Sequence, residues 1–150
     1  MTFLDVSENL VSNLGSLSGL SNLQELRLWG NQIEDVVPIA NCTQIERLVL
    51  SMNQIADVDA LSGLHKLEEL ELSHNLLGDL SPFAELTSLT VLHLDHNQIA
   101  DLAPLVANPG IDAGDEVYVR SNPIDCEQQA ANIAELVMRG VLLDIDCPLE

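Results

Sequence analysis

The sequence feature that most constrains the fold is a series of asparagines that recur at a fixed interval. Five of them lie 22 residues apart and a sixth follows after 25 residues; they are Asn9, Asn31, Asn53, Asn75, Asn97 and Asn122. The surrounding residues repeat as well, since residues 26–33 and 92–99 share the pattern Leu-x-Leu-x-x-Asn-Gln-Ile. A constant period of about 20–50 residues is typical of repeat proteins whose units stack on one another. The chain is therefore predicted to be a solenoid.

The composition supports one domain with an aliphatic core. The 150 residues are 47% hydrophobic but only 3% aromatic, so the core must consist of Leu, Ile, Val and Ala. The 24 acids outnumber the 5 bases, giving a net charge of -19. Such a chain repels phosphates, so we expect no nucleic-acid partner. No apolar run approaches the roughly 20 residues of a membrane helix, so we expect no membrane insertion.

The repeat has the form Leu-x-x-Leu-x-x-Leu-x-Leu-x-x-Asn-x-Ile-x-Asp-Leu-x-Pro, completed by Leu86, Leu89, Leu92, Leu94, Asn97, Ile99, Asp101, Leu102 and Pro104 in its fullest copy. This pattern resembles the leucine-rich repeat, in the 22-residue class of bacterial internalins and of a nuclear regulatory subunit of protein phosphatase. The resemblance covers about residues 3–126. It implies an α/β fold, a right-handed horseshoe solenoid with short parallel strands on its concave face and 3₁₀ or turn segments on its convex face.

The side-chain pattern of one repeat leads to the same picture. Alternate residues of a strand point to opposite faces, so Leu26 and Leu28 point inward while Arg27 and Trp29 point outward. An inward asparagine offers donors and an acceptor to the backbone of a sharp corner, so we predict a structural role for the asparagine series. The aspartates four residues later are expected to accept amides that begin the return turn; they are Asp35, Asp57, Asp79 and Asp101.

Three regions are expected within the single domain of residues 1–150. Residues 1–16 read as a partial first repeat without an N-terminal cap, because Leu4 and Val6 occupy the places of Leu26 and Leu28. Residues 17–126 hold the repeats, with a loop of three extra residues before 117. Residues 127–150 read as a C-terminal cap whose helix spans 127–139. Its predicted inward stripe comprises Ala130, Ile133, Ala134, Leu136 and Val137.

The lengths of the cap elements bring two cysteines together. The helix runs about 20 Å and residues 141–147 return about 23 Å, so Cys147 comes back beside Cys126. We predict a disulfide between them; the alternative is a pair of reduced thiols in a cytosolic protein. Cys42 shares a column with Leu64 and is expected to be a small buried hydrophobe. A disulfide favours a secreted or cell-surface protein, whereas a cytoplasmic location stays open with reduced thiols.

The outward positions of the strands are the candidate binding residues. A cationic and apolar group near the N-terminus comprises Arg27, Trp29, Arg47, Val49 and Met52, and a polar group near the C-terminus comprises His93, Asp95, Tyr118 and Arg120. Glu71 lies between them. Trp and Arg are frequent at interaction hot spots, so both groups are predicted to contact a partner.

Catalytic and metal-binding patterns are weak. His74 and His96 lie one period apart, close to His93 and Asp95, but no cysteine pair or His-Glu helix motif accompanies them. We therefore predict neither metal nor cofactor. No nucleophile elbow, phosphate loop or dinucleotide fingerprint occurs, and paired carboxylates on an open sheet are not desolvated. The chain is expected not to be an enzyme.

The sequence thus predicts a non-enzymatic scaffold that binds a protein or peptide on its concave sheet face, as part of a larger exported bacterial protein. Two alternatives remain. The uncapped N-terminal coil could pair with another copy in a homodimer, or the chain could be a regulatory subunit of an intracellular enzyme such as a phosphatase.

Overall fold

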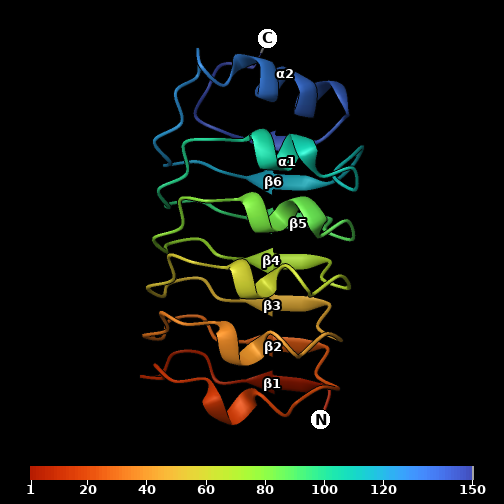
Figure 1. The fold of residues 1–150 in the computed structure, drawn as a ribbon. Helices are drawn as coiled ribbons and strands as arrows, with labels where there is room; N and C mark the ends of the chain where they lie inside the picture. Colours follow the sequence, from red (N-terminus) through yellow and green to blue (C-terminus); the bar gives the residue numbers. More distant parts are fainter. Residues whose placement is uncertain (150) are drawn as a thin grey trace.

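The chain winds upward as a column of coils, each with one short strand on one side and one helical turn on the other (Figure 1). The computed structural model describes residues 1–149; Glu150, the last residue of the expected cap, lies outside the described residues. The predicted solenoid is confirmed. No helix of the described residues has both the length and the apolar character needed to cross a bilayer.

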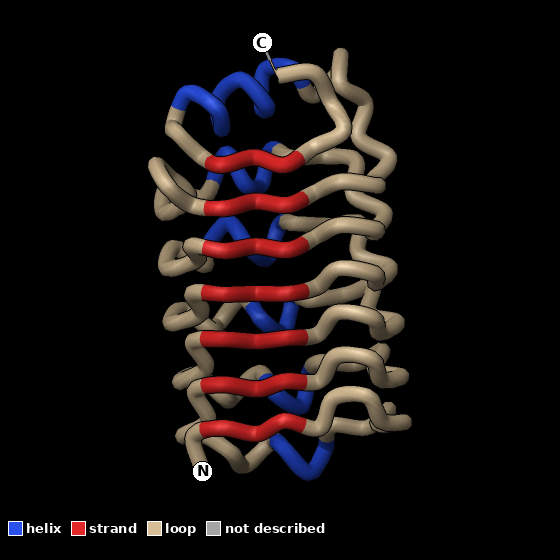
Figure 2. Tube along the Cα trace, turned by 180° about the vertical axis from the view of Figure 1, so that it is seen from behind, coloured by secondary structure: helices blue, strands red, loops and turns tan. Residues whose placement is uncertain are grey.

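All strands belong to one parallel sheet in chain order (Figure 2). They are β1 (Phe3–Asp5), β2 (Glu25–Arg27), β3 (Arg47–Val49), β4 (Glu69–Glu71), β5 (Val91–His93), β6 (Glu116–Tyr118) and β7 (Leu142–Asp144). The register is constant, so Leu26, Leu48, Leu70 and Leu92 face one another in succession. The sequence predicted only an extended return over residues 141–147, and its pairing as the seventh strand is an addition.

Helical turns form the opposite side of the column. They are η1 (Gly15–Leu17), η2 (Val37–Ile39), η3 (Asp59–Leu61), η4 (Ser81–Glu85) and the short helix α1 (Ala103–Ala107). Each of the four predicted aspartates accepts the amide two residues ahead, as Asp35 does from Val37 at 2.8 Å. This contact fixes where the turn begins. The first positions of η2, η4 and α1 need no amide donor, and they hold Pro38, Pro82 and Pro104.

The core lies between the sheet and the helical turns. Leu26, Leu48 and Leu70 have no exposed surface, and Cys42 is buried in the same core, as expected. Burial raises the pKa of that thiol. Because coils stack without gaps, each unit buries its apolar face only against its neighbours.

The predicted asparagine ladder is present. The amide of Asn53 donates to the carbonyl groups of Leu50 in its own coil and Leu28 in the coil before, at 2.9 and 3.0 Å. Its carbonyl oxygen accepts the amide of Ile33 in the preceding coil at 3.0 Å. Asn31, Asn75, Asn97 and Asn122 repeat this arrangement. Asn9 differs, because it is exposed and bonds only to carbonyl groups of its own coil.

One buried asparagine outside the ladder was not predicted from the sequence. Asn108 has no exposed surface, and its amide donates to the carbonyl groups of Phe83 and Leu86 at 2.7 and 3.0 Å. Its oxygen accepts the amide of Gly110 at 2.7 Å. The loop that interrupts the period is thereby tied to the preceding coil.

Each corner also contains a residue in the left-handed region, directly before the ladder asparagine. These residues are Glu8, Gly30, Met52, His74, His96 and Ser121, with φ between 54° and 66°. Only Gly30 adopts this conformation without a side-chain penalty. The corner backbone is therefore dictated by the stacking of coils rather than by local preference.

The cap differs from expectation in its helix. The helix α2 spans Ala130–Met138 instead of 127–139, because residues 127–129 form a turn in which the Asp125 carboxylate accepts the amides of Glu127 and Gln128. Ile133 and Leu136 face the core as predicted. The predicted disulfide is confirmed: Cys126 and Cys147 are bonded, with Cα atoms 5.6 Å apart.

Candidate functional site

The outward side chains of the strands form three columns, which we call the sheet face. The columns are Phe3, Glu25, Arg47, Glu69, Val91, Glu116 and Leu142; Asp5, Arg27, Val49, Glu71, His93, Tyr118 and Asp144; and Ser7, Trp29, Ser51, Ser73, Asp95, Arg120 and Asp146. The third column lies just past the strand ends, where bonds such as Gly30 N–H to Ser51 O continue the register at 3.0 Å. Trp29, Asp95 and Arg120 are therefore beside the strands and not on them.

The N-terminal part of the sheet face is not the cationic patch that the sequence suggested. Arg27 is paired with Glu25 at 2.6 Å, and its guanidinium lies 5.5 Å from the centre of the Phe3 ring. Arg47 reaches onto β4, where it contacts Glu69 and Glu71 at 3.0 Å each. The hydrogen bond to Glu71 raises the pKa of Arg47. Carboxylates that neighbour both arginines thus neutralise them.

Two further residues of the expected N-terminal group differ from the prediction: Val49 lies in the predicted column but is buried, and Met52 lies outside the columns. Val49 is only 5% exposed, because its neighbours in the column, Arg27 and Glu71, flank it on both sides. The side chain of Arg47 also extends past Val49 to reach Glu71. Met52 is exposed, but it occupies a left-handed corner beyond the strand. Trp29 is half-buried beside the sheet and is less accessible than Phe3, which is 49% exposed, or Met52, which is 52% exposed.

The C-terminal part brings the predicted polar residues together. The rings of His93 and Tyr118 stack with their centres 4.4 Å apart. The Tyr118 hydroxyl donates to Glu116, which raises the pKa of the phenol. Arg120 is paired with Asp144 of β7, and its backbone amide donates to Asp95 at 2.9 Å. The sequence did not predict that β7 would add Asp144 and Asp146 to the sheet face. The alternating buried residues Val141, Leu143 and Ile145 form the pattern that could have predicted this strand.

His74 and His96 stack at a centre-to-centre distance of 4.1 Å, as their spacing suggested. Both are exposed corner residues, away from the columns that hold His93. Their ring planes are within 12° of parallel, so the nitrogen lone pairs run side by side and do not converge on one point. Residues 1–149 contain no group of three His, Cys, Asp or Glu side chains placed to hold a metal.

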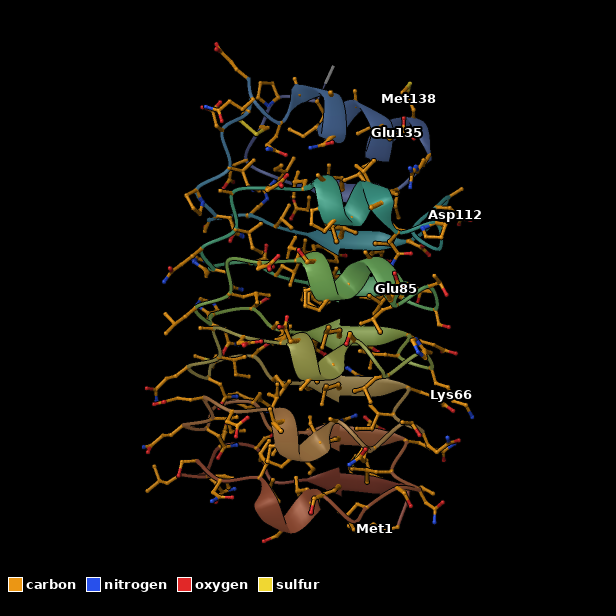
Figure 3. The ribbon with its side chains drawn as sticks, in the orientation of Figure 1. Met1, Lys66, Glu85, Asp112, Glu135 and Met138 are labelled. Carbon is orange, nitrogen blue, oxygen red and sulfur yellow. A yellow bond between two sulfur atoms is a disulfide. The ribbon has the colours of Figure 1, made fainter. Side chains whose placement is uncertain are left out.

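The outer side of the cap carries an apolar groove of about 440 Å³. It is lined chiefly by Ala130, Ala134, Val137, Met138 and Leu149. Ala130, Ala134 and Val137 were predicted to face the core, but they are exposed because α2 rests on the last coil through the narrower stripe of Ile133 and Leu136. Met138 projects from this end of the column (Figure 3).

Comparison with known proteins gives one family. A model described as leucine-rich repeats (two copies) matches residues 1–41, 21–64, 43–85 and 65–107. No curated protein sequence matches the chain.

Several solved structures share the fold. Internalin C2 of Listeria monocytogenes is 32% identical with a TM-score of 0.85, over 97% of this chain and 61% of that one. The internalin InlF of the same species is 25% identical with a TM-score of 0.84, over 97% and 43%. A leucine-rich repeat protein of Leptospira interrogans is 22% identical with a TM-score of 0.67 and shows likeness in fold alone. The chain thus spans 61% and 43% of the two internalin structures.

Proposed function

Because the chain belongs to the leucine-rich repeat family, we propose that it is a non-enzymatic module that binds a protein or peptide partner on its sheet face. Proteins of this architecture generally use the strand side of the solenoid as an extended binding surface. The partner contacts proposed from the sequence are retained where the side chain is accessible, which excludes only the buried Val49. They are Arg27, Trp29, Arg47, Met52, Glu71, His93, Asp95, Tyr118 and Arg120.

The observation that carries the proposal is the constant register of the seven strands. It places every outward side chain directly beside its equivalent in the next coil, and the asparagines from Asn31 to Asn122 bond each of their corners to the preceding coil. A surface fixed in this way loses little conformational entropy when a partner docks. The sheet is about 29 Å long from β1 to β7, because its six inter-strand distances are each about 4.8 Å. An extended peptide of about nine residues would cover this length.

Compartment is a separate part of the proposal. The Cys126–Cys147 disulfide supports an exported or cell-surface bacterial protein, because disulfides persist mainly in oxidising compartments. Thiol titration of the denatured, unreduced protein should find one reactive thiol, that of Cys42. Three reactive thiols in protein isolated from its native compartment would remove the argument for export.

The binding surface can be tested with a displayed library of random peptides of about nine residues. Selected peptides should lose at least tenfold in affinity for the double variant Trp29→Ala, Tyr118→Ala, because large amphipathic side chains dominate interface energies. The matched control is Val37→Ala, Met138→Ala, since these side chains are 65% and 76% exposed away from the sheet face. Selected peptides that bind both double variants as tightly as the parent would refute binding on the sheet face.

Homodimerisation through the first coil is the second candidate. Phe3 and Leu10 are 49% and 79% exposed, and β1 is paired on one side only, with β2. Light scattering should then report a dimer that Leu10→Glu dissociates. A monomer at all concentrations would eliminate this candidate and leave the sheet-face proposal intact.

A further inference from the structure

The sheet face differs in charge between its two ends. Over β1 to β3 the acids Asp5 and Glu25 balance Arg27 and Arg47, beside the apolar surfaces of Phe3 and Trp29. Over β4 to β7 six carboxylates surround a single cation, Arg120; they belong to Glu69, Glu71, Asp95, Glu116, Asp144 and Asp146. The face is therefore neutral and partly apolar at one end and strongly acidic at the other.

Internal ion pairs reduce this charge without cancelling it. Arg47 forms ion pairs with Glu69 and Glu71 of β4, and Arg120 forms an ion pair with Asp144 of β7. Each arginine contacts one oxygen of its partner carboxylates, and the second oxygen of Glu69, Glu71 and Asp144 has no hydrogen bond or ion pair within residues 1–149. Six carboxylates and the single cation Arg120 leave an excess of five negative charges over β4 to β7, and Arg47, which belongs to β3 and is counted with the other end, reaches across to two of these carboxylates.

The stacked rings of His93 and Tyr118 lie at the centre of this acidic end. The hydrogen bond from Tyr118 to Glu116 holds the phenol in place, so the pair forms a fixed amphipathic platform between β5 and β6. Aromatic rings flanked by carboxylates accommodate both parts of an arginine or lysine side chain, the apolar stem and the cationic head.

Building on the proposed function, we propose that the partner is an extended basic segment with a fixed orientation. Its arginine- or lysine-rich end lies over β4 to β7, and its apolar or aromatic end lies over β1 to β3 beside Trp29 and Phe3. Charge complementarity sets the direction in which the segment lies, and the net charge of -19 attracts it from a distance.

The test uses peptides of about nine residues selected from the random library, together with isosteric neutralisation of acids. On the face, Asp95→Asn, Glu116→Gln and Asp146→Asn are combined, because each amide keeps an acceptor oxygen for the existing hydrogen bond. The control combines Glu85→Gln, Asp112→Asn and Glu127→Gln, three exposed acids off the sheet face, two of which are marked in Figure 3. Both triple variants lose the same net charge.

We expect the selected peptides to carry basic residues at one end, to lose at least tenfold in affinity for the face variant and to keep their affinity for the control. A peptide with reversed sequence should bind at least tenfold more weakly. Peptides that depend on Trp29 and Tyr118 but show no basic end, equal binding to both triple variants or equal binding when reversed would overturn this inference alone. Peptides indifferent to Trp29 and Tyr118 would overturn the proposed function as well.

Discussion

The carboxamide of Asn53 satisfies backbone groups of two coils at once. It donates to Leu28 and Leu50 and accepts from Ile33, and all of these groups are buried. At this scale the sequence was sufficient, because only an inward asparagine at constant spacing supplies donors and an acceptor to every corner. The left-handed residue before it was not foreseen, since this conformation carries a steric cost for residues with a side chain, such as Met52, His74 and His96.

Replacing Asn53 with alanine should lower the free energy of unfolding by about 3 kcal/mol, because it leaves a buried amide and buried carbonyl groups without partners. Urea unfolding at constant pH measures the change. Asn9→Ala is the matched control, since Asn9 is exposed and contacts no preceding coil. Its effect should stay below about 1 kcal/mol. Equal losses for both variants would contradict the role assigned to the ladder.

Tyr118 provides a test of the sheet face by titration. Its hydrogen bond to Glu116 raises the phenol pKa above 10.0, and as the only tyrosine it gives an unambiguous absorbance signal. Because the folded-state pKa is raised, the stability from this contact is present below the unfolded pKa and is lost as pH rises through the folded pKa. Glu116→Gln should lower the pKa of Tyr118. A pKa unaffected by this change would mean that the hydroxyl does not contact Glu116 in solution.

At the scale of elements, the cap is joined to the solenoid by packing and by one covalent bond. The predicted disulfide followed from the lengths of a helix and an extended return, which are simple geometric quantities. The rotation of α2 about its axis did not follow from them. Ala130, Ala134 and Val137 are apolar enough to face the core, and only the shape of the last coil selects Ile133 and Leu136 instead.

Replacing Cys126 and Cys147 with alanine should destabilise the cap by about 3 kcal/mol, because the bond closes a loop with a sequence separation of 21. Coils of a solenoid contact only their neighbours, so the loss should be local. Hydrogen exchange should accelerate in α2 and β7 while β2 to β4 keep their protection. Uniform acceleration along the chain would contradict this view of the cap, and Cys42→Ala serves as a core comparison without any disulfide.

Gly110 lies directly against the backbone of Thr87 in the preceding coil. A β-carbon there would lie 2.1 Å from the carbonyl oxygen of Thr87 and 2.6 Å from its Cα, so the backbone would have to move. Gly110→Ala should therefore lower the melting temperature by several degrees, corresponding to about 2 kcal/mol of overpacking. Gly63→Ala is the control, because no atom lies within 4 Å of its β-carbon. A larger loss at Gly63 than at Gly110 would contradict the stacking described here.

At the scale of the whole molecule, the column of coils was predictable and the character of its binding face was only partly so. The period assigned the outward positions of six coils correctly, because alternation along a strand leaves no other choice. Grouping Arg27 and Arg47 by charge type was misleading, since Arg27 pairs with Glu25 of its own strand and Arg47 pairs with Glu69 and Glu71 of the next coil. A long side chain such as Arg47 can form an ion pair with a neighbouring coil, and the repeat spacing alone does not predict which residue it pairs with.

The central claim is that the sheet face, and not the helical side or the cap groove, meets the partner. Backbone and indole chemical shifts of isotope-labelled protein, followed by NMR during titration with a selected peptide, test it most directly. We predict shifts at the indole of Trp29, the only tryptophan, and along β2 to β6, with no change in η2 to η4. Shifts confined to α2 and the groove beside Met138, or to the helical turns, would contradict it.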